Sequence, residues 1–144
     1  MAVRRVSPEE ALELIDKEGY VYVDVRSVPE FSAGHPAGAV NVPLLHTSAF
    51  GMSPNHEFVE VMEKAFPKNA KLVVGCRAGS RSLQAATILQ SVGYSNVVEQ
   101  RGGFEGSGGF FGRGEPGWRQ KGFPVSQEAP PENTWDGLRT RTLS

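Results

Sequence analysis

Helical segments and short apolar strands alternate along this 144-residue sequence, and this alternation constrains the fold more than any other feature. Runs rich in β-branched and aromatic residues predict buried strands at 20–25, 70–75 and 95–100. A strong helix start, or apolar residues at helical spacing, predicts helices over 6–16, 56–66 and 81–94. Helices that connect strands in this way place the strands parallel and cover both faces of the sheet. The sequence therefore predicts an α/β fold with a central, mainly parallel sheet and helices on both faces.

Local signals sharpen parts of this prediction. Ser7 as N-cap, Pro8 in the first turn and Glu10 at the third helical position form the pattern of a capping box. The stretch 26–43 is predicted to be loop-rich, with a short extended piece at 39–42, and 50–55 has the composition of a turn. The strand at 70–75 matters most, because Cys76 follows it and a helix begins near Ser80. Strand-to-helix turns of this kind lie at the carboxyl edge of an α/β sheet, where ligands bind.

Charge and composition exclude several classes of function. The 15 Lys and Arg residues nearly balance the 16 Asp and Glu residues, and a net charge of −1 argues against nucleic-acid or membrane-surface binding. No apolar run approaches the roughly 20 residues of a membrane span, and the start "MAVRRV" lacks the apolar core of a signal peptide. A single cysteine cannot form an internal disulfide. We therefore expect a reducing compartment such as the cytoplasm, or an organelle reached with a transit peptide that is later removed.

Neither a metal nor a cofactor is expected. His35, His46 and His56 are too far apart for one helix or short loop to gather them around an ion. The segment "GRGEPG" at 112–117 matches the G-x-G-x-x-G pattern of dinucleotide sites. It follows a glycine-rich stretch instead of a strand, and no helix comes after it, so we interpret it as a surface loop.

The only cysteine of the chain has a setting that packing alone does not require. Cys76 ends the apolar run "VVGC" and is followed by Arg77, Gly79 and Arg81. The small residues after it let backbone N–H groups curl around the sulfur, and the helix that follows presents its positive end. Both arginines add charge and can fork onto an anion. "VVGC" by itself favours a buried, inert cysteine, but the glycine and the two arginines favour an anion-binding loop with a nucleophile at its centre.

The chemistry that suits this loop needs no general base during attack. No histidine, lysine or carboxylate near Cys76 in the sequence is clearly placed for that task. Transfer of a sulfane sulfur fits, because a thiolate attacks an S–S bond, sulfite leaves as an anion and a persulfide remains. Only four residues, 77–80, separate Cys76 from Arg81. The loop of tyrosine-type phosphatases has one residue more, so the smaller loop better suits a persulfide sulfur than a phosphate group.

These residues resemble the rhodanese (thiosulfate sulfurtransferase) family over about residues 5–125. The resemblance rests on "DVRSVPEFSAGHPAGAVNVP", on "VVGCRAGSRS", and on "RGGF" followed later by "W" and "GFPV". The stretch "GMSPNHEF" and the approach "VGC" are most similar to single-domain rhodaneses of plants and their bacterial relatives. The resemblance implies a rhodanese-like three-layer α/β domain and a transferase activity.

The same resemblance implies roles for individual residues. Cys76 would be the nucleophile that forms the persulfide. The substrate would be bound by the loop residues Arg77, Ala78, Gly79, Ser80 and Arg81. Support of the site is expected from Asp24, Arg26 and Glu30, with an ion pair between Arg26 and Glu30. Without the family, Asp24 at a strand end is also a candidate catalytic acid.

The sequence departs from the family pattern near its end. About a dozen extra residues, rich in glycine, separate "GGF" from the tryptophan. We therefore predict a rhodanese-like domain over 1–125 with a glycine-rich insertion at about 105–117, and an extended or disordered tail over 126–144. Phe104, Phe110 and Phe111 are candidates to line a pocket or a partner surface, or to fold back onto the core. Trp135 and Leu138 are candidates to pin the tail to the body or to a partner.

Three functions remain in competition at this stage. The leading one is a thiosulfate sulfurtransferase that passes sulfur from thiosulfate to cyanide in the laboratory and to a thiol or protein in the cell. The second is a persulfide carrier or interaction module that delivers sulfur to one protein partner. The third is a small phosphatase or arsenate reductase, which the loop length disfavours.

Overall fold

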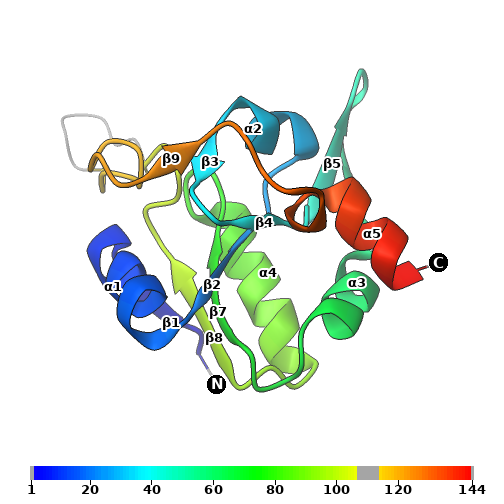
Figure 1. Ribbon diagram of the computed structural model, residues 1–144, viewed down its shortest axis with the longest axis horizontal. Helices are drawn as coiled ribbons and strands as arrows, with labels where there is room; N and C mark the ends of the chain where they lie inside the picture. Colours follow the sequence, from blue (N-terminus) through cyan, green and yellow to red (C-terminus); the bar gives the residue numbers. More distant parts are fainter. Residues whose placement is uncertain (1, 107–113, 144) are drawn as a thin grey trace.

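A five-stranded parallel sheet forms the centre of the computed structural model, which describes residues 2–106 and 114–143 (Figure 1). Every neighbouring pair of strands in this sheet is parallel. In spatial order the strands are β1 (Arg4–Val6), β8 (Asn96–Gln100), β7 (Lys71–Gly75), β2 (Val21–Asp24) and β4 (Val40–Asn41). The predicted parallel sheet is confirmed, and β7, which precedes Cys76, is its central strand.

Helices cover both faces of the sheet. The main helices are α1 (Pro8–Glu18), α2 (Val28–Ala33), α3 (Phe58–Ala65), α4 (Ser80–Ser91) and α5 (Trp135–Leu143). Successive residues of β7 point to opposite faces: Leu72 and Val74 pack in one apolar cluster with α3, α4 and α5, and Val73 packs in the other with α1. Figure 1 shows α1 on one side of the strands and α4 on the other. The three-layer α/β architecture is therefore confirmed.

The start of α1 follows the predicted capping box. The Ser7 side chain accepts the Glu10 N–H, and the Glu10 side chain accepts the Ser7 N–H, while Pro8 occupies the first turn. Gly19 ends the helix in the left-handed region with φ of 74°. No helix within the described ranges is long and apolar enough to cross a membrane.

Two stretches that the sequence predicted to be irregular contain regular structure. Within 26–43 lies α2, whose six residues are too few to show a helical period, with Ser27 and Glu30 forming its capping box. Residues 45–54 form a hairpin of β5 (Leu45–Ser48) and β6 (Gly51–Pro54), so 50–55 is more than a turn. A second short ladder joins β3 (His35–Pro36) to β9 (Val125–Ser126) and ties the region after Trp118 to the body.

The prediction of an extended or disordered tail over 126–144 is wrong for its second half. A 3₁₀ turn at Pro131–Asn133 leads into α5, which lies beside α3 (Figure 1). Trp135 and Leu138 are 6% and 1% exposed and belong to the main apolar cluster. Arg139 also pairs with Glu57 at 2.7 Å. Trp135, Leu138 and Leu143 are too few to show a helical period, so packing in the main cluster and the ion pair with Glu57 stabilise this helix.

Most of the glycine-rich insertion lies outside the described residues, and with it Phe110 and Phe111. Phe104, just before the insertion, is 4% exposed and packs in the cluster on the α1 side of the sheet. It therefore folds back onto the core, although its ring also reaches the cavity described below.

Candidate active site

Cys76 lies at the carboxyl edge of the central strand, where β7 turns into α4. The turn closes at Gly79, whose φ of 104° is in the region that favours glycine. A Cβ at this position would also lie 2.4 Å from the backbone oxygen of Arg101. Glycine is therefore required at this point both for the backbone conformation and for space.

The sulfur of Cys76 is enclosed. The residue is 2% exposed, the Gly79 N–H donates to Sγ at 3.1 Å, and the Ser82 hydroxyl oxygen lies 3.3 Å from Sγ. The Cys76 and Arg77 carbonyls accept hydrogen bonds from the backbone N–H groups of Phe104 and Glu105, at 2.7 and 2.9 Å. Phe104 and Glu105 therefore hold these two carbonyls in place. The Gly79 N–H and the positive end of α4 face the sulfur.

The two arginines of the loop have different surroundings. Arg77 is exposed and lines a cavity beside the loop. Arg81 is half-buried and forms two hydrogen bonds to the Glu30 carboxylate, at 2.7 and 3.0 Å. Because Glu30 occupies the fork of the Arg81 guanidinium, this fork is not open to an anion in the structure, and anion binding by Arg77 stays a prediction. Of the other loop residues, Ala78 and Ser80 are exposed.

The Arg81–Glu30 pair shifts both ionisations. Burial opposes the charge of Glu30, but hydrogen bonds from Arg81 and Ser27 override it and lower the pKa of this carboxyl to about 2. The Glu30 carboxylate in turn raises the pKa of Arg81 against the opposing effect of burial. This pair joins α2 to the start of α4 and holds the catalytic loop to the first loop of the fold.

The predicted ion pair between Arg26 and Glu30 is wrong. Arg26 folds back onto Asp24, with Nη2 2.7 Å from Oδ2 and the Arg26 N–H donating to Oδ1 at 3.0 Å. Arg26 also donates to the Gly34 carbonyl at 2.6 Å, and its guanidinium lies 4.3 Å from the centre of the Phe104 ring. Burial opposes the charge of Arg26, yet Asp24 raises its pKa. Asp24 is two residues away and buried with Arg26, whereas Glu30 lies in the first turn of α2 and pairs with Arg81 of α4.

Asp24 is fully engaged in this structural pair. Both of its side-chain oxygens accept from Arg26, and the residue is 1% exposed. The backbone carbonyls of Asp24 and Arg26 accept from the Asn41 side chain at 3.0 and 2.9 Å. This arrangement favours support of the first loop over the alternative of a catalytic acid.

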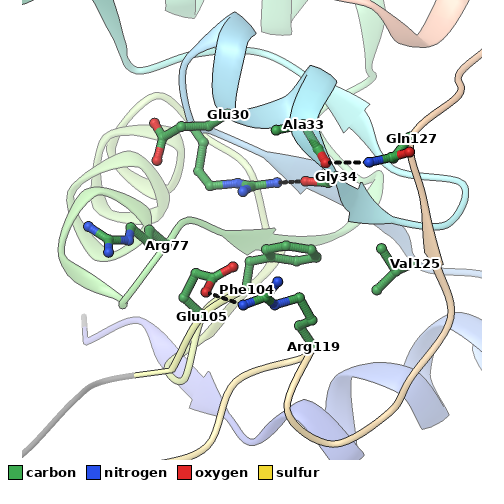
Figure 2. Close-up of a pocket in the computed structure, with 10 residues that line it drawn as sticks. Glu30, Ala33, Gly34, Arg77, Phe104, Glu105, Arg119, Val125 and Gln127 are labelled. Atoms are coloured by element: carbon green, nitrogen blue, oxygen red, sulfur yellow. Dashed lines mark hydrogen bonds and ion pairs between the residues drawn. The ribbon is translucent and has the colours of Figure 1, made fainter.

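A cavity of about 410 Å³ lies beside the loop (Figure 2). Its walls combine apolar surface with charges of both signs. It is lined by Arg26, Glu30, Ala33, Gly34, Arg77, Phe104, Glu105, Arg119, Val125 and Gln127. Figure 2 shows Arg119 and Glu105 joined by an ion pair of 3.0 Å, and Gln127 joined to the Ala33 carbonyl. The sequence did not predict Glu105, Arg119 or Gln127 at the site, because they are distant from Cys76 in sequence and only the fold brings them to the loop.

Two buried polar residues beneath the sulfur were also not predicted. Ser82 lies on α4 and Glu99 on β8, and both are 0% exposed. Glu99 pairs with Arg5, with Oε1 2.6 Å from Nε. A glutamate inside an apolar strand was the available signal, because a buried carboxylate is costly without partners.

The described residues contain no group of three or more His, Cys, Asp or Glu that could hold a metal ion. His35 has a structural environment: its ring stacks on Phe31, with centroids 3.8 Å apart, and its two nitrogens lie 2.7 and 3.0 Å from the carbonyls of Phe31 and Glu128.

Sequence comparison finds one family over most of this chain. The family model described as "Rhodanese-like domain" matches residues 7–107. The chain is 37% identical over 107 residues to thiosulfate sulfurtransferase 16, a chloroplastic protein of Arabidopsis thaliana, covering 74% of this chain and 80% of that protein. It is 37% identical over 102 residues to the thiosulfate sulfurtransferase GlpE of Pseudomonas putida, covering 71% and 82%. With the senescence-associated protein DIN1 of Raphanus sativus, 40% identity over 86 residues covers 60% of this chain and 47% of that longer protein.

Solved structures give the same result for the fold. Rv0390 from M. tuberculosis superposes with a TM-score of 0.72 at 27% identity, covering 89% of this chain and all of that one. A human single-domain sulfurtransferase superposes with a TM-score of 0.59 at 25% identity, covering 72% and 93%. The resemblance stated from the sequence, and the fold class it implied, are confirmed.

Proposed function

Because the chain belongs to the rhodanese-like domain family, we propose that it is a sulfurtransferase that moves sulfane sulfur through a persulfide on Cys76. The observation that carries this proposal is the position of the only cysteine. Its sulfur lies at the carboxyl edge of the central strand, where the Gly79 N–H donates to it at the start of α4. A backbone N–H and a helix N-terminus both favour negative charge on the sulfur and on a sulfur atom attached to it.

The reaction has two displacements. The Cys76 sulfur attacks the outer sulfur of thiosulfate, the S–S bond breaks, and sulfite leaves with the electron pair of that bond. Cys76 then carries the outer sulfur as a persulfide. An acceptor, cyanide in the laboratory or a thiol in the cell, attacks this terminal sulfur and restores the Cys76 thiolate. Nothing is oxidised or reduced overall beyond the transfer of one sulfane sulfur from donor to acceptor.

The loop residues take different parts in this proposal. Arg77, exposed at the cavity, guides the anionic donor, and the backbone of residues 77–81 surrounds the transferred sulfur. Arg81 supplies positive charge near Cys76 while Glu30 fixes its position. Asp24 and Arg26 hold the opposite wall of the cavity.

The cavity suits an acceptor larger than cyanide. Its volume of about 410 Å³ exceeds what one small anion fills, and apolar and charged residues share its walls. A thiol compound or the cysteine of a protein partner is the acceptor class that this supports. Reduced thiols are the rule in the cytoplasm, which is the compartment we propose, with a reducing organelle as the alternative.

Intact-protein mass spectrometry tests the proposal. The reduced protein is incubated with thiosulfate and compared with Cys76→Ser. Wild type should gain the mass of one sulfur atom and the variant should not. Cyanide should remove that mass while an equal amount of thiocyanate forms. A wild-type protein that gains no sulfur, although iodoacetamide still alkylates Cys76, would refute it.

Two variants that each remove one positive charge separate the role of Arg77 in binding the donor from the effect of the net charge of the protein. Arg77→Ala should raise the KM for thiosulfate about tenfold, because it removes the charge at the cavity. Arg4 is exposed at the start of the outer strand β1, whereas Cys76 lies at the carboxyl end of the central strand. Arg4→Ala removes the same charge and should leave KM unchanged. If persulfide forms rapidly but small acceptors discharge it slowly, the carrier function replaces the enzyme.

A further inference from the structure

A chain of buried hydrogen bonds runs beneath the catalytic sulfur and ends at an exposed arginine. Sγ of Cys76 lies 3.3 Å from Oγ of Ser82, and Ser82 donates to Oε2 of Glu99 at 2.5 Å. The other oxygen of Glu99 accepts from Nε of Arg5 at 2.6 Å. The groups come from four elements: the end of β7, the first turn of α4, β8 and β1. These hydrogen bonds join Cys76 to Glu99, a carboxylate that the sulfur-transfer scheme above does not use.

The location of Glu99 argues for a specific task. Its neighbours Val97 and Val98 are core residues, and Glu99 itself is 0% exposed. A buried carboxylate costs free energy unless each oxygen has a partner. Here Arg5 satisfies one oxygen and Ser82 the other. Packing alone would favour an apolar residue at this position.

The direction of the hydrogen bonds follows from the number of protons. A serine hydroxyl has one proton, and an ionised carboxylate can only accept. Ser82 therefore gives its proton to Glu99 and turns a lone pair toward Cys76, and the Cys76 thiol donates to Ser82. The three groups are arranged so that a proton leaving the thiol ends on Glu99.

We propose that Ser82 and Glu99 form the internal base of Cys76, with Ser82 relaying the thiol proton to the Glu99 carboxylate. The S–H bond breaks as an O–H bond forms on Ser82, and the original O–H bond of Ser82 breaks as one forms on Oε2 of Glu99. The electron pair of the S–H bond stays on sulfur as the nucleophile. The proton returns by the reverse route when an acceptor leaves the thiolate behind. Ser82 contacts the reacting sulfur, and Glu99 is a positioning residue that acts through Ser82.

The surroundings limit which groups can change charge in this region. Among the described residues, Arg5 from β1 pairs with Glu99, Tyr22 from β2 interacts with Cys76 and Glu99, and Arg81 from α4 interacts with Cys76. Neither arginine loses its proton in a protein. Burial raises the pKa of Tyr22 well above its ordinary value of 10.0, so it stays neutral. Cys76 and Glu99 are therefore the two groups that Ser82 joins and between which one proton can move.

A shared proton has a distinctive kinetic signature. The form with a thiol and a carboxylate and the form with a thiolate and a carboxylic acid contain the same number of protons, so pH does not change their ratio. The rate of alkylation by iodoacetamide should therefore level off at a shoulder on the acid side of the pH profile instead of falling about tenfold per pH unit. Glu99→Gln keeps the size of the side chain and an oxygen for Arg5 but cannot take the proton, so the shoulder should disappear.

Further variants separate the relay from a structural role. Ser82→Ala removes the bridge and should also abolish the shoulder, whereas Ser82→Thr keeps a hydroxyl and should retain it. Glu13→Gln, at an exposed residue of α1, is the matched control and should behave as wild type. A wild-type profile without a shoulder, or a shoulder that survives in Glu99→Gln or Ser82→Ala, would overturn the relay.

The relay rests on the proposed reactivity of Cys76, and the alkylation assay separates the two proposals because it needs no sulfur donor. Sulfite release from thiosulfate, measured on the same samples, should have the same shape of pH profile. A shoulder in alkylation without any sulfite release would support the relay while refuting the thiosulfate reaction. Loss of both shoulders in Glu99→Gln, with the far-UV circular dichroism unchanged, is the expected result.

Discussion

Replacing Glu30 with glutamine tests how the catalytic loop is held to the rest of the fold. The carboxyl has an ordinary pKa of 4.5 and a pKa of about 2 in the folded protein. A difference of about 2.5 units corresponds to about 3 kcal/mol of stabilisation at neutral pH. The Glu30 and Arg81 side chains are 26% and 14% exposed, so water screens part of this interaction. We expect Glu30→Gln to lose about 1–3 kcal/mol at about pH 7.

The pH dependence provides the sharper test. Folding lowers the pKa of Glu30, so its contribution is fully present above about pH 4.5 and is lost as the pH falls toward about 2. Between about pH 7 and about pH 3 the difference in unfolding free energy between wild type and variant should shrink by up to about 2 kcal/mol. Urea unfolding at each pH, followed by circular dichroism, measures this difference.

A suitable control is Glu60→Gln. Glu60 is 56% exposed and lies 3.4 Å from Lys64 on the surface of α3. Its replacement should change stability by less than about 0.5 kcal/mol at any of these pH values. If Glu30→Gln and wild type differ by the same amount at every pH, the ion pair with Arg81 is not the source of the stabilisation.

Two further substitutions test the backbone of the loop and the end of the chain. Gly79→Ala should destabilise by about 1–3 kcal/mol in urea unfolding and slow persulfide loading, because its Cβ meets the Arg101 carbonyl at 2.4 Å and φ is 104°. Gly38→Ala, with φ of 84° and open space around the Cβ, should lose stability without losing the loading rate, and equal loading in both variants would contradict the steric argument. Trp135→Ala should cost about 3–5 kcal/mol in urea unfolding because Trp135 is buried in the main apolar cluster. The exposed Arg141→Ala should change stability by less than about 0.5 kcal/mol, and a Trp135→Ala value that small would mean that α5 does not stabilise the core.

Features that depend on neighbouring residues were predictable from the sequence. The capping box of Ser7 and Glu10, the parallel sheet and the turn from β7 into α4 all follow from short-range patterns. The glycine at position 79 could be interpreted in the same way, because a tight turn before a helix restricts the backbone locally. Cys76 could be proposed as the nucleophile from the sequence because the residues that suggest this chemistry lie within six positions of it.

Features that depend on which side chains meet across the fold were decided only by the tertiary structure. Arg81 could equally have faced the substrate, but α2 places Glu30 against it, and Arg26 then pairs with Asp24. Glu99 reaches Cys76 through Ser82 only because β8 lies beside β7 and beneath α4. The helix at Trp135–Leu143 has too few apolar residues to show a period and forms by packing on α3. Local patterns determine the strands of the sheet and the helices that connect them. The C-terminal helix, the ion pairs and the buried networks join residues distant in sequence, so their partners are fixed only when the chain is packed.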